Sequence, residues 1–108
     1  MQIFKEQRLG GGHWSRPRRK WIQIVVQKEK FKYKQLFNFY VATLRDVFDY
    51  LVQRFDLGHM TTHYLSDDHD HIFMNLDQTL FSIHLFYPHI LYMKYGHSCK
   101  MRFHLHEI

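Results

Sequence analysis

The sequence predicts an α+β fold, in which one main helix packs on a mixed sheet of four to five strands and an extra strand follows at the C-terminus. Two observations support this prediction. Residues 43–57 have the apolar spacing of one amphipathic helix, and the segments on either side alternate with the two-residue period of strands. The chain has 108 residues, 45% of them hydrophobic, which suffices for one core. We therefore expect a single folded domain over residues 21–108.

The residues before this domain differ from it in composition. Residues 1–20 contain three consecutive glycines, a proline and a run of cationic side chains, which is typical of a flexible segment. We therefore expect a flexible basic arm in front of the domain.

The first two strands are predicted to form a hairpin. In residues 21–27, Ile22, Ile24 and Val26 lie on one side of the alternation. Residues 31–41 alternate again after the polar sequence KEK. The two runs are short and close in sequence, so antiparallel pairing is expected.

The predicted helix follows the hairpin directly. The Thr43 hydroxyl is placed to accept a hydrogen bond from the backbone N–H of Asp46, and Gly58 is placed to adopt a left-handed conformation after the last turn. We expect one face of this helix to pack on the sheet. Its apolar positions are Leu44, Val47, Phe48, Leu51 and Phe55.

The chain after the helix is predicted to be mostly extended. We expect short strands at residues 63–65 and 72–74, and a compact turn that tucks Leu80, Ile83 and Leu85 under the sheet. Residues 90–95 are predicted as the last strong strand. Residues 101–106 alternate once more, as an extra strand or an extended tail, so we expect deletion of residues 96–108 to leave the fold intact.

A resemblance to a known family rests on two segments. Residues 77–95, DQTLFSIHLFYPHILYMKY, combine a turn, Thr-Leu, a tucked apolar turn and a strand, and residues 42–51, ATLRDVFDYL, form a helix entry. Both segments resemble the ubiquitin-like superfamily, and the order of predicted elements is that of its β-grasp fold. The resemblance covers residues 21–95 and implies a protein-interaction module without enzymatic activity.

Two branches of this superfamily look similar to the chain. The ubiquitin-like domain of Polycomb RING-finger proteins shares the pattern of Thr79, Leu80, Ile83 and residues 91–95, and the ubiquitin-like subunit of the minor spliceosome is similar at residues 42–46. Both imply an adaptor in a nuclear complex. Conjugated modifiers end in Gly-Gly after the last strand, whereas here the chain continues beyond Gly96, so conjugation is not expected.

The candidate protein-binding residues lie in the last two predicted strands. Tyr92 and Lys94 occupy the side of residues 90–95 that the resemblance places on the open side of the sheet. Met101, Phe103 and Leu105 form the apolar side of the C-terminal strand. That strand can pair within the chain, with a partner's sheet, or with a second copy in a homodimer.

The alternative partner is nucleic acid. The formal net charge is +5, and cations recur at every second position of the hairpin. Such cations can contact phosphates, and they can equally keep an edge strand soluble. The candidates are Arg16, Arg18, Arg19 and Lys20 in the arm and Lys28, Lys30, Lys32 and Lys34 in the hairpin.

A polar cluster at residues 66–71, SDDHDH, raises the question of a metal site. His69 and His71 could hold zinc or nickel, but a solvated turn explains the same composition, so we predict neither a metal site nor a cofactor. Cys99 has histidines nearby but no indication of a pocket, so neither an enzyme nor a small-molecule substrate is expected.

The expected location follows from two features of the sequence. A lone cysteine fits a reducing compartment, and no apolar run is long enough to span a membrane. We therefore expect a nuclear or cytoplasmic protein that has no membrane partner.

Overall fold

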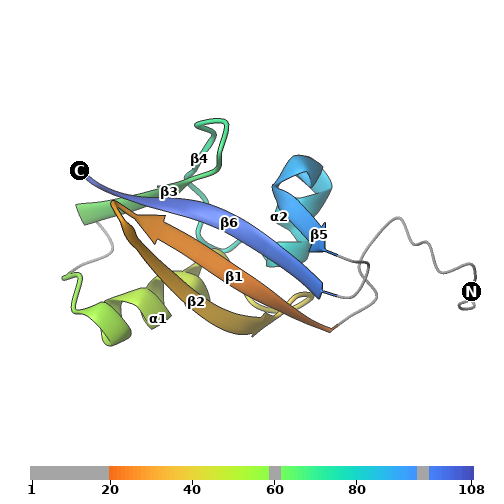
Figure 1. Ribbon diagram of the computed structural model, residues 1–108, viewed down its shortest axis with the longest axis horizontal. Coiled ribbons are helices and arrows are strands. Elements are labelled where there is room, and N and C mark those ends of the chain that lie inside the picture. The colour runs from red at the N-terminus through yellow and green to blue at the C-terminus, as the bar shows by residue number, and fades with distance from the viewer. Residues whose placement is uncertain (1–19, 59–61, 95–97) are drawn as a thin grey trace, which may run out of the picture.

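The computed structural model describes residues 20–58, 62–94 and 98–108 (Figure 1). Over these residues it has the expected α+β class, with a mixed six-stranded sheet, two α-helices and a short 3₁₀ turn after the second helix. The strands are β1 (Trp21–Lys28), β2 (Phe31–Asn38), β3 (His63–Ser66), β4 (Ile72–Phe73), β5 (Leu91–Lys94) and β6 (Ser98–Glu107). The helices are α1 (Leu44–Phe55) and α2 (Leu80–Phe86), and the 3₁₀ turn is η2 (Pro88–Ile90).

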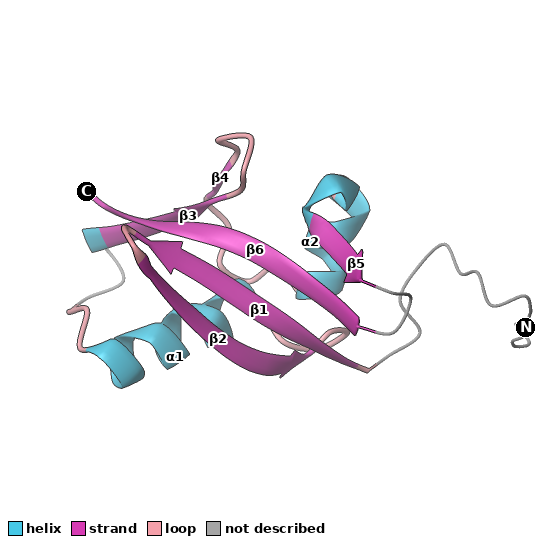
Figure 2. Cartoon of the chain, in the orientation of Figure 1, coloured by secondary structure: helices cyan, strands magenta, loops and turns pink. Residues whose placement is uncertain are grey.

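The C-terminal strand lies at the centre of the sheet (Figure 2). The strand order is β2-β1-β6-β3-β4, with β6 parallel to β1 and antiparallel to β3. Among the strands described, β5 pairs with β6 alone, on the same side as β3. The expected strand after residue 96 therefore forms, but its expected place as an addition to a complete sheet was wrong. The predicted last strand, residues 90–95, is instead a short addition to β6.

Helix α1 forms as the sequence indicates. Its N-terminus is a capping box: the Thr43 backbone N–H donates to Asp46 Oδ2 at 2.8 Å, and the Asp46 N–H donates to Thr43 Oγ1 at 3.3 Å. The helix ends earlier than expected, because Asp56 adopts the left-handed conformation with φ 52°. Gly58 also has a positive φ, 82°, but lies beyond the end of the helix.

The core lies between α1 and one face of the sheet. α1 contributes Leu44, Val47, Phe48 and Leu51, all of which are buried. α2 closes one end of this core: Thr79 caps it, and Leu80 and Ile83 are fully buried. Leu85 is 62% exposed, so its predicted place under the sheet was wrong. Among the described residues, no helix is long and apolar enough to cross a membrane.

Candidate interaction face

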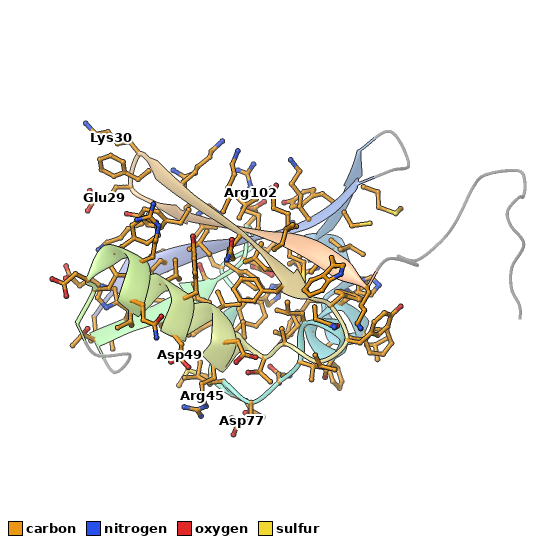
Figure 3. The ribbon with its side chains drawn as sticks, turned by 90° about the horizontal axis from the view of Figure 1, so that it is seen from below. Glu29, Lys30, Arg45, Asp49, Asp77 and Arg102 are labelled. Carbon is orange, nitrogen blue, oxygen red and sulfur yellow. The ribbon has the colours of Figure 1, made fainter. Side chains whose placement is uncertain are left out.

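The side of the sheet opposite α1 is not covered by a described helix, and we call it the open face. Ile22, Ile24, Met101 and Phe103 point into the core and are at most 1% exposed. Because strand side chains alternate, their neighbours in sequence point the other way. Figure 3 shows Arg102 projecting from the sheet on the side opposite α1. The open face comprises Lys32, Lys34 and Leu36 of β2, Trp21, Gln23, Val25 and Gln27 of β1, Lys100, Arg102, His104 and His106 of β6, and Tyr92 of β5.

The centre of the open face is an apolar residue between two cations. Across the strands, Val25 pairs with Lys34 on one side and with Arg102 on the other. Val25 is only 3% exposed although it lies outside the core cluster. The aliphatic parts of long cationic side chains can cover such a residue while their charges stay in water. The charges of Lys34 and Arg102 therefore flank one position.

Exposed apolar side chains lie at one end of the open face. Leu36, which is 60% exposed, pairs with Gln23, and Gln23 pairs with Lys100. Tyr92 pairs with Lys100 from the other side and is 36% exposed. Trp21, which is 56% exposed, precedes this row on β1. The open face thus combines cations with large exposed apolar groups.

The turn between β3 and β4 is attached to the rim of the open face by Asp68. Its carboxylate accepts a hydrogen bond from the Tyr92 hydroxyl and lies 2.5 Å from His104 Nε2. Partial burial by itself raises the pKa of Asp68, but the hydrogen bonds from Tyr92 and His104 outweigh it and lower the pKa. The hydrogen bond to Asp68 raises the pKa of Tyr92. Tyr92 is therefore held in place at the edge of the face.

The neighbouring Asp67 is buried, contrary to the expectation of a solvated turn. Its side chain is 0% exposed and accepts hydrogen bonds from His71 and His89, at 2.9 and 2.8 Å. Burial by itself raises the pKa of Asp67, but these bonds and those from the backbone N–H groups of His71 and His69 lower it to about 2. Asp67 therefore remains ionised at neutral pH.

The structure separates the predicted protein-binding residues into two groups. Met101 and Phe103 are fully buried and Leu105 is 4% exposed, so they form core contacts and their assignment to a partner surface was wrong. β6 pairs with β1 on one side and with β3 and β5 on the other. Along these paired residues, its backbone has no open edge to which a strand of a second copy could add. Tyr92 does lie on the open face. Lys94 ends β5, and its side chain lies outside the described residues.

The predicted cations also divide into groups. Lys32 and Lys34 lie on the open face and are exposed. Lys28 ends β1 and Lys30 lies in the turn before β2, so they mark the end of the hairpin (Figure 3). Lys20 is exposed at the start of β1, where its carbonyl accepts from the Phe39 N–H at 2.6 Å. Arg16, Arg18 and Arg19 lie outside the described residues.

Sequence reasoning missed the cations of β6. Lys100 and Arg102 alternate with Cys99, Met101 and Phe103, which is the signal of a strand with one buried and one open side. That alternation was recognised, but the partner surface was assigned to the apolar side of the strand. No protein-family model matches the chain, and no curated protein matches it in sequence.

Proposed function

We propose that the chain is a non-enzymatic β-grasp module of a nuclear or cytoplasmic complex, and that its open face binds an acidic partner protein. One observation carries the proposal: Lys34 and Arg102 stand on either side of Val25, with Lys32 and Lys100 in the adjacent rows. Four cations on one exposed sheet surface would attract carboxylates. Exposed Trp21, Leu36 and Tyr92 would provide apolar contacts at one end.

The β-grasp assignment is supported by the order of the elements. An antiparallel hairpin is followed by a helix, two short strands, a short helical segment, the short strand β5 and a final strand beside the first. The final strand runs parallel to β1. The ubiquitin-like resemblance also implies a final strand beside the first, but it placed that strand at residues 90–95, whereas we assign the role to β6.

A binding mode through the face is favoured over one through a sheet edge. β2 forms one edge, but the Tyr50 hydroxyl of α1 donates to the Lys34 carbonyl oxygen at 3.2 Å, so a helix side chain already contacts this backbone. β4, at the other edge, has only two residues. Strand addition needs a longer row of available backbone groups.

The charges of the described residues are distributed unevenly over the two sides of the sheet. Asp49 and Asp77 lie on the α1 side, whereas Arg102 lies on the open side (Figure 3). Arg45, also on the α1 side, is paired with Asp77 at 3.1 Å. An acidic surface would therefore be oriented towards the open face, because opposite charges steer encounter.

The absence of an enzymatic role is part of the proposal. Cys99, the nucleophile considered from the sequence, is 5% exposed and belongs to the core cluster. A catalytic thiolate needs access to substrate and a polar environment that stabilises its charge. The position of Cys99 supports a packing role instead.

Nucleic acid is the second candidate, because the same cations could contact phosphates. Lys32, Lys34, Lys100 and Arg102 lie on neighbouring strands, and Trp21 and Tyr92 offer rings for stacking on bases. A phosphate partner would give an affinity that falls steeply as salt is raised. The two candidates can therefore be separated experimentally.

The experiment compares capture by the full chain with capture by a double variant, Lys34→Glu with Arg102→Glu. The control is Arg45→Glu on the α1 side, where the exposed ion pair with Asp77 contributes little stability. Tagged proteins are incubated with nuclease-treated lysate, and captured proteins are quantified by mass spectrometry. We expect specific partners to fall at least tenfold with the double variant and to be retained by the control.

Two results would contradict the protein-binding proposal. One is the same set of captured proteins for all three baits. The other is capture that disappears after nuclease treatment while a single-stranded RNA or DNA oligonucleotide binds the purified chain directly. In that case, we expect a linear fall in the logarithm of the binding constant with the logarithm of the salt concentration. The magnitude of this slope should decrease by about one for each phosphate contact removed.

A further inference from the structure

Three potential metal ligands from two separate segments meet beside the open face. Asp67 and His69 belong to the turn between β3 and β4, and His89 comes from η2. Each offers one ligand atom, and these atoms all lie within 4.8 Å of one another. The sequence indicated only the histidines of the turn, because His89 lies 22 positions after Asp67.

The Asp67 carboxylate is held in a fixed orientation. Oδ1 accepts from the backbone N–H groups of His69 and His71, at 2.8 and 2.9 Å. Oδ2 lies 2.9 Å from His71 Nδ1 and 2.8 Å from His89 Nε2. With Oδ1 occupied by the backbone, Oδ2 is the atom that faces the histidine rings.

The two histidines are accessible. His69 and His89 are both exposed, and their rings meet edge to face with centroids 4.5 Å apart. The ring nitrogens of His69 make no hydrogen bond within the described part of the chain. An ion can therefore reach the two histidine rings from solvent, and an outward movement of the rings would open Asp67 Oδ2, whose side chain is 0% exposed.

We propose that this cluster is a zinc site, in which Asp67 Oδ2 and one ring nitrogen each of His69 and His89 coordinate the ion. Imidazole nitrogen and carboxylate oxygen are ordinary zinc ligands. Two such ligands on a tetrahedral ion lie about 3.3 Å apart, given bond lengths near 2.0 Å. His89 Nε2, at 2.8 Å, needs to move outward by only about half an ångström.

The remaining groups complete the site. When His89 coordinates through Nε2, its ring proton moves to Nδ1, and the hydrogen bond to Asp67 is replaced by the ion. His71 keeps its bond to Oδ2 and continues to orient the carboxylate. Water occupies the fourth position. The ion would link the β3–β4 turn to η2 and thereby fix Asp68, which holds Tyr92 at the rim of the open face.

The test titrates the full chain with zinc chloride in a calorimeter, without any partner. We expect one ion per chain at this cluster, with His69→Gln and His89→Gln each weakening it at least tenfold. His106→Gln is the matched control, because His106 lies on the same sheet but contacts Ser66 and Tyr64 instead. The control should change the affinity less than twofold.

A second readout does not depend on heat of binding. Cobalt(II) bound by this cluster should give the intense visible absorption of tetrahedral coordination, and His89→Gln should abolish it. Zinc should also raise the melting temperature of the wild type and not that of His89→Gln. Zinc binding that is absent, that His69→Gln and His89→Gln leave unchanged, or that His106→Gln weakens equally would overturn the proposal and indicate adventitious binding only.

Discussion

The two faces of β6 have opposite roles, although their residues alternate along one strand. On the core face, Met101 and Phe103 are fully buried against the α1 side. On the open face, Lys100 and Arg102 are only partly covered, and they pair with Gln23 and Val25 of β1. The difference shows that stability and binding can be changed separately by substituting adjacent residues.

The largest expected effect comes from removing the strand that carries both faces. Deletion of residues 98–108 takes away the central pairing partner of β1, β3 and β5 and four buried side chains. Contrary to the expectation from the sequence that deletion of residues 96–108 leaves the fold intact, we expect the shortened chain to be unfolded, as measured by circular dichroism and by loss of a cooperative thermal transition. A chain that lacks only Ile108, which is 83% exposed, should keep its transition.

The next prediction compares two adjacent residues. Phe103→Ala leaves a cavity in the core and should lower the free energy of unfolding by about 3–5 kcal/mol. Arg102→Ala, on the open face, should change it by no more than about 1 kcal/mol, since only surface contacts over Val25 are lost. Urea unfolding measures both. Equal losses for the two variants would contradict the assignment of the faces.

A smaller effect on the free energy of unfolding is expected from Asp67. It is measured with a chelator present, so that no metal ion contributes. Its pKa in the folded state is about 2, below the usual value of 3.8, and its side chain is fully buried. Because the pKa of Asp67 is lower in the folded state than in the unfolded state, ionisation of Asp67 stabilises the fold. The stabilisation is about 2.5 kcal/mol above about pH 4, and it is lost as the pH falls through 2. Asp67→Asn should be less stable than the wild type by a similar amount at pH 7, and the difference should disappear near pH 2.

The smallest expected effect involves His84 of α2. Partial burial lowers the pKa of His84, and its Nδ1 is buried with no hydrogen-bond partner among the described residues. The neutral ring is therefore favoured in the folded state. Its contribution to the free energy of unfolding is fully present above pH 6.5 and is lost as the pH falls below that value, because the unfolded chain then binds the proton more readily. His84→Phe, which keeps the ring contact with Phe39, should reduce the drop in melting temperature between pH 7.5 and 5.5. An unchanged drop would contradict this role.

The local elements could be predicted from the sequence because their signals are local. The capping box of Thr43 and Asp46, the apolar face of α1 and the alternation of the hairpin each lie within a few residues. Leu85 was misplaced because its segment was treated as a turn. In the helix that forms, five positions at 3.6 residues per turn place Leu85 on the other side from Leu80.

The pairing of the last two strands could not be predicted in the same way. Residues 91–94 are apolar at three positions and were predicted as part of the last strong strand, yet they form only a short strand that pairs with β6. Residues 101–106 alternate strictly, which indicates one buried side but does not say which strands lie next to them. The neighbours of β6 are set by contacts distant in sequence, above all with β1.

The candidate sites depend on the same distant contacts. Lys34 and Arg102 come together only because both of their strands pair with β1. Asp67 is buried only because the residues around η2 pack on its turn, and His89 contacts it across 22 positions. Composition alone indicated a solvated turn and a basic hairpin, which are the local parts of each site.

The central claim is that β6 is the innermost strand of the sheet and that its outward side is the binding face. Amide hydrogen exchange of the free chain tests the structural part of this claim directly. We predict that residues 101–105 exchange at the slow rate set by global unfolding, more slowly than residues 31–38 of the edge strand β2. Exchange of residues 101–105 that is as fast as at the edge would show a loosely attached tail and contradict the account.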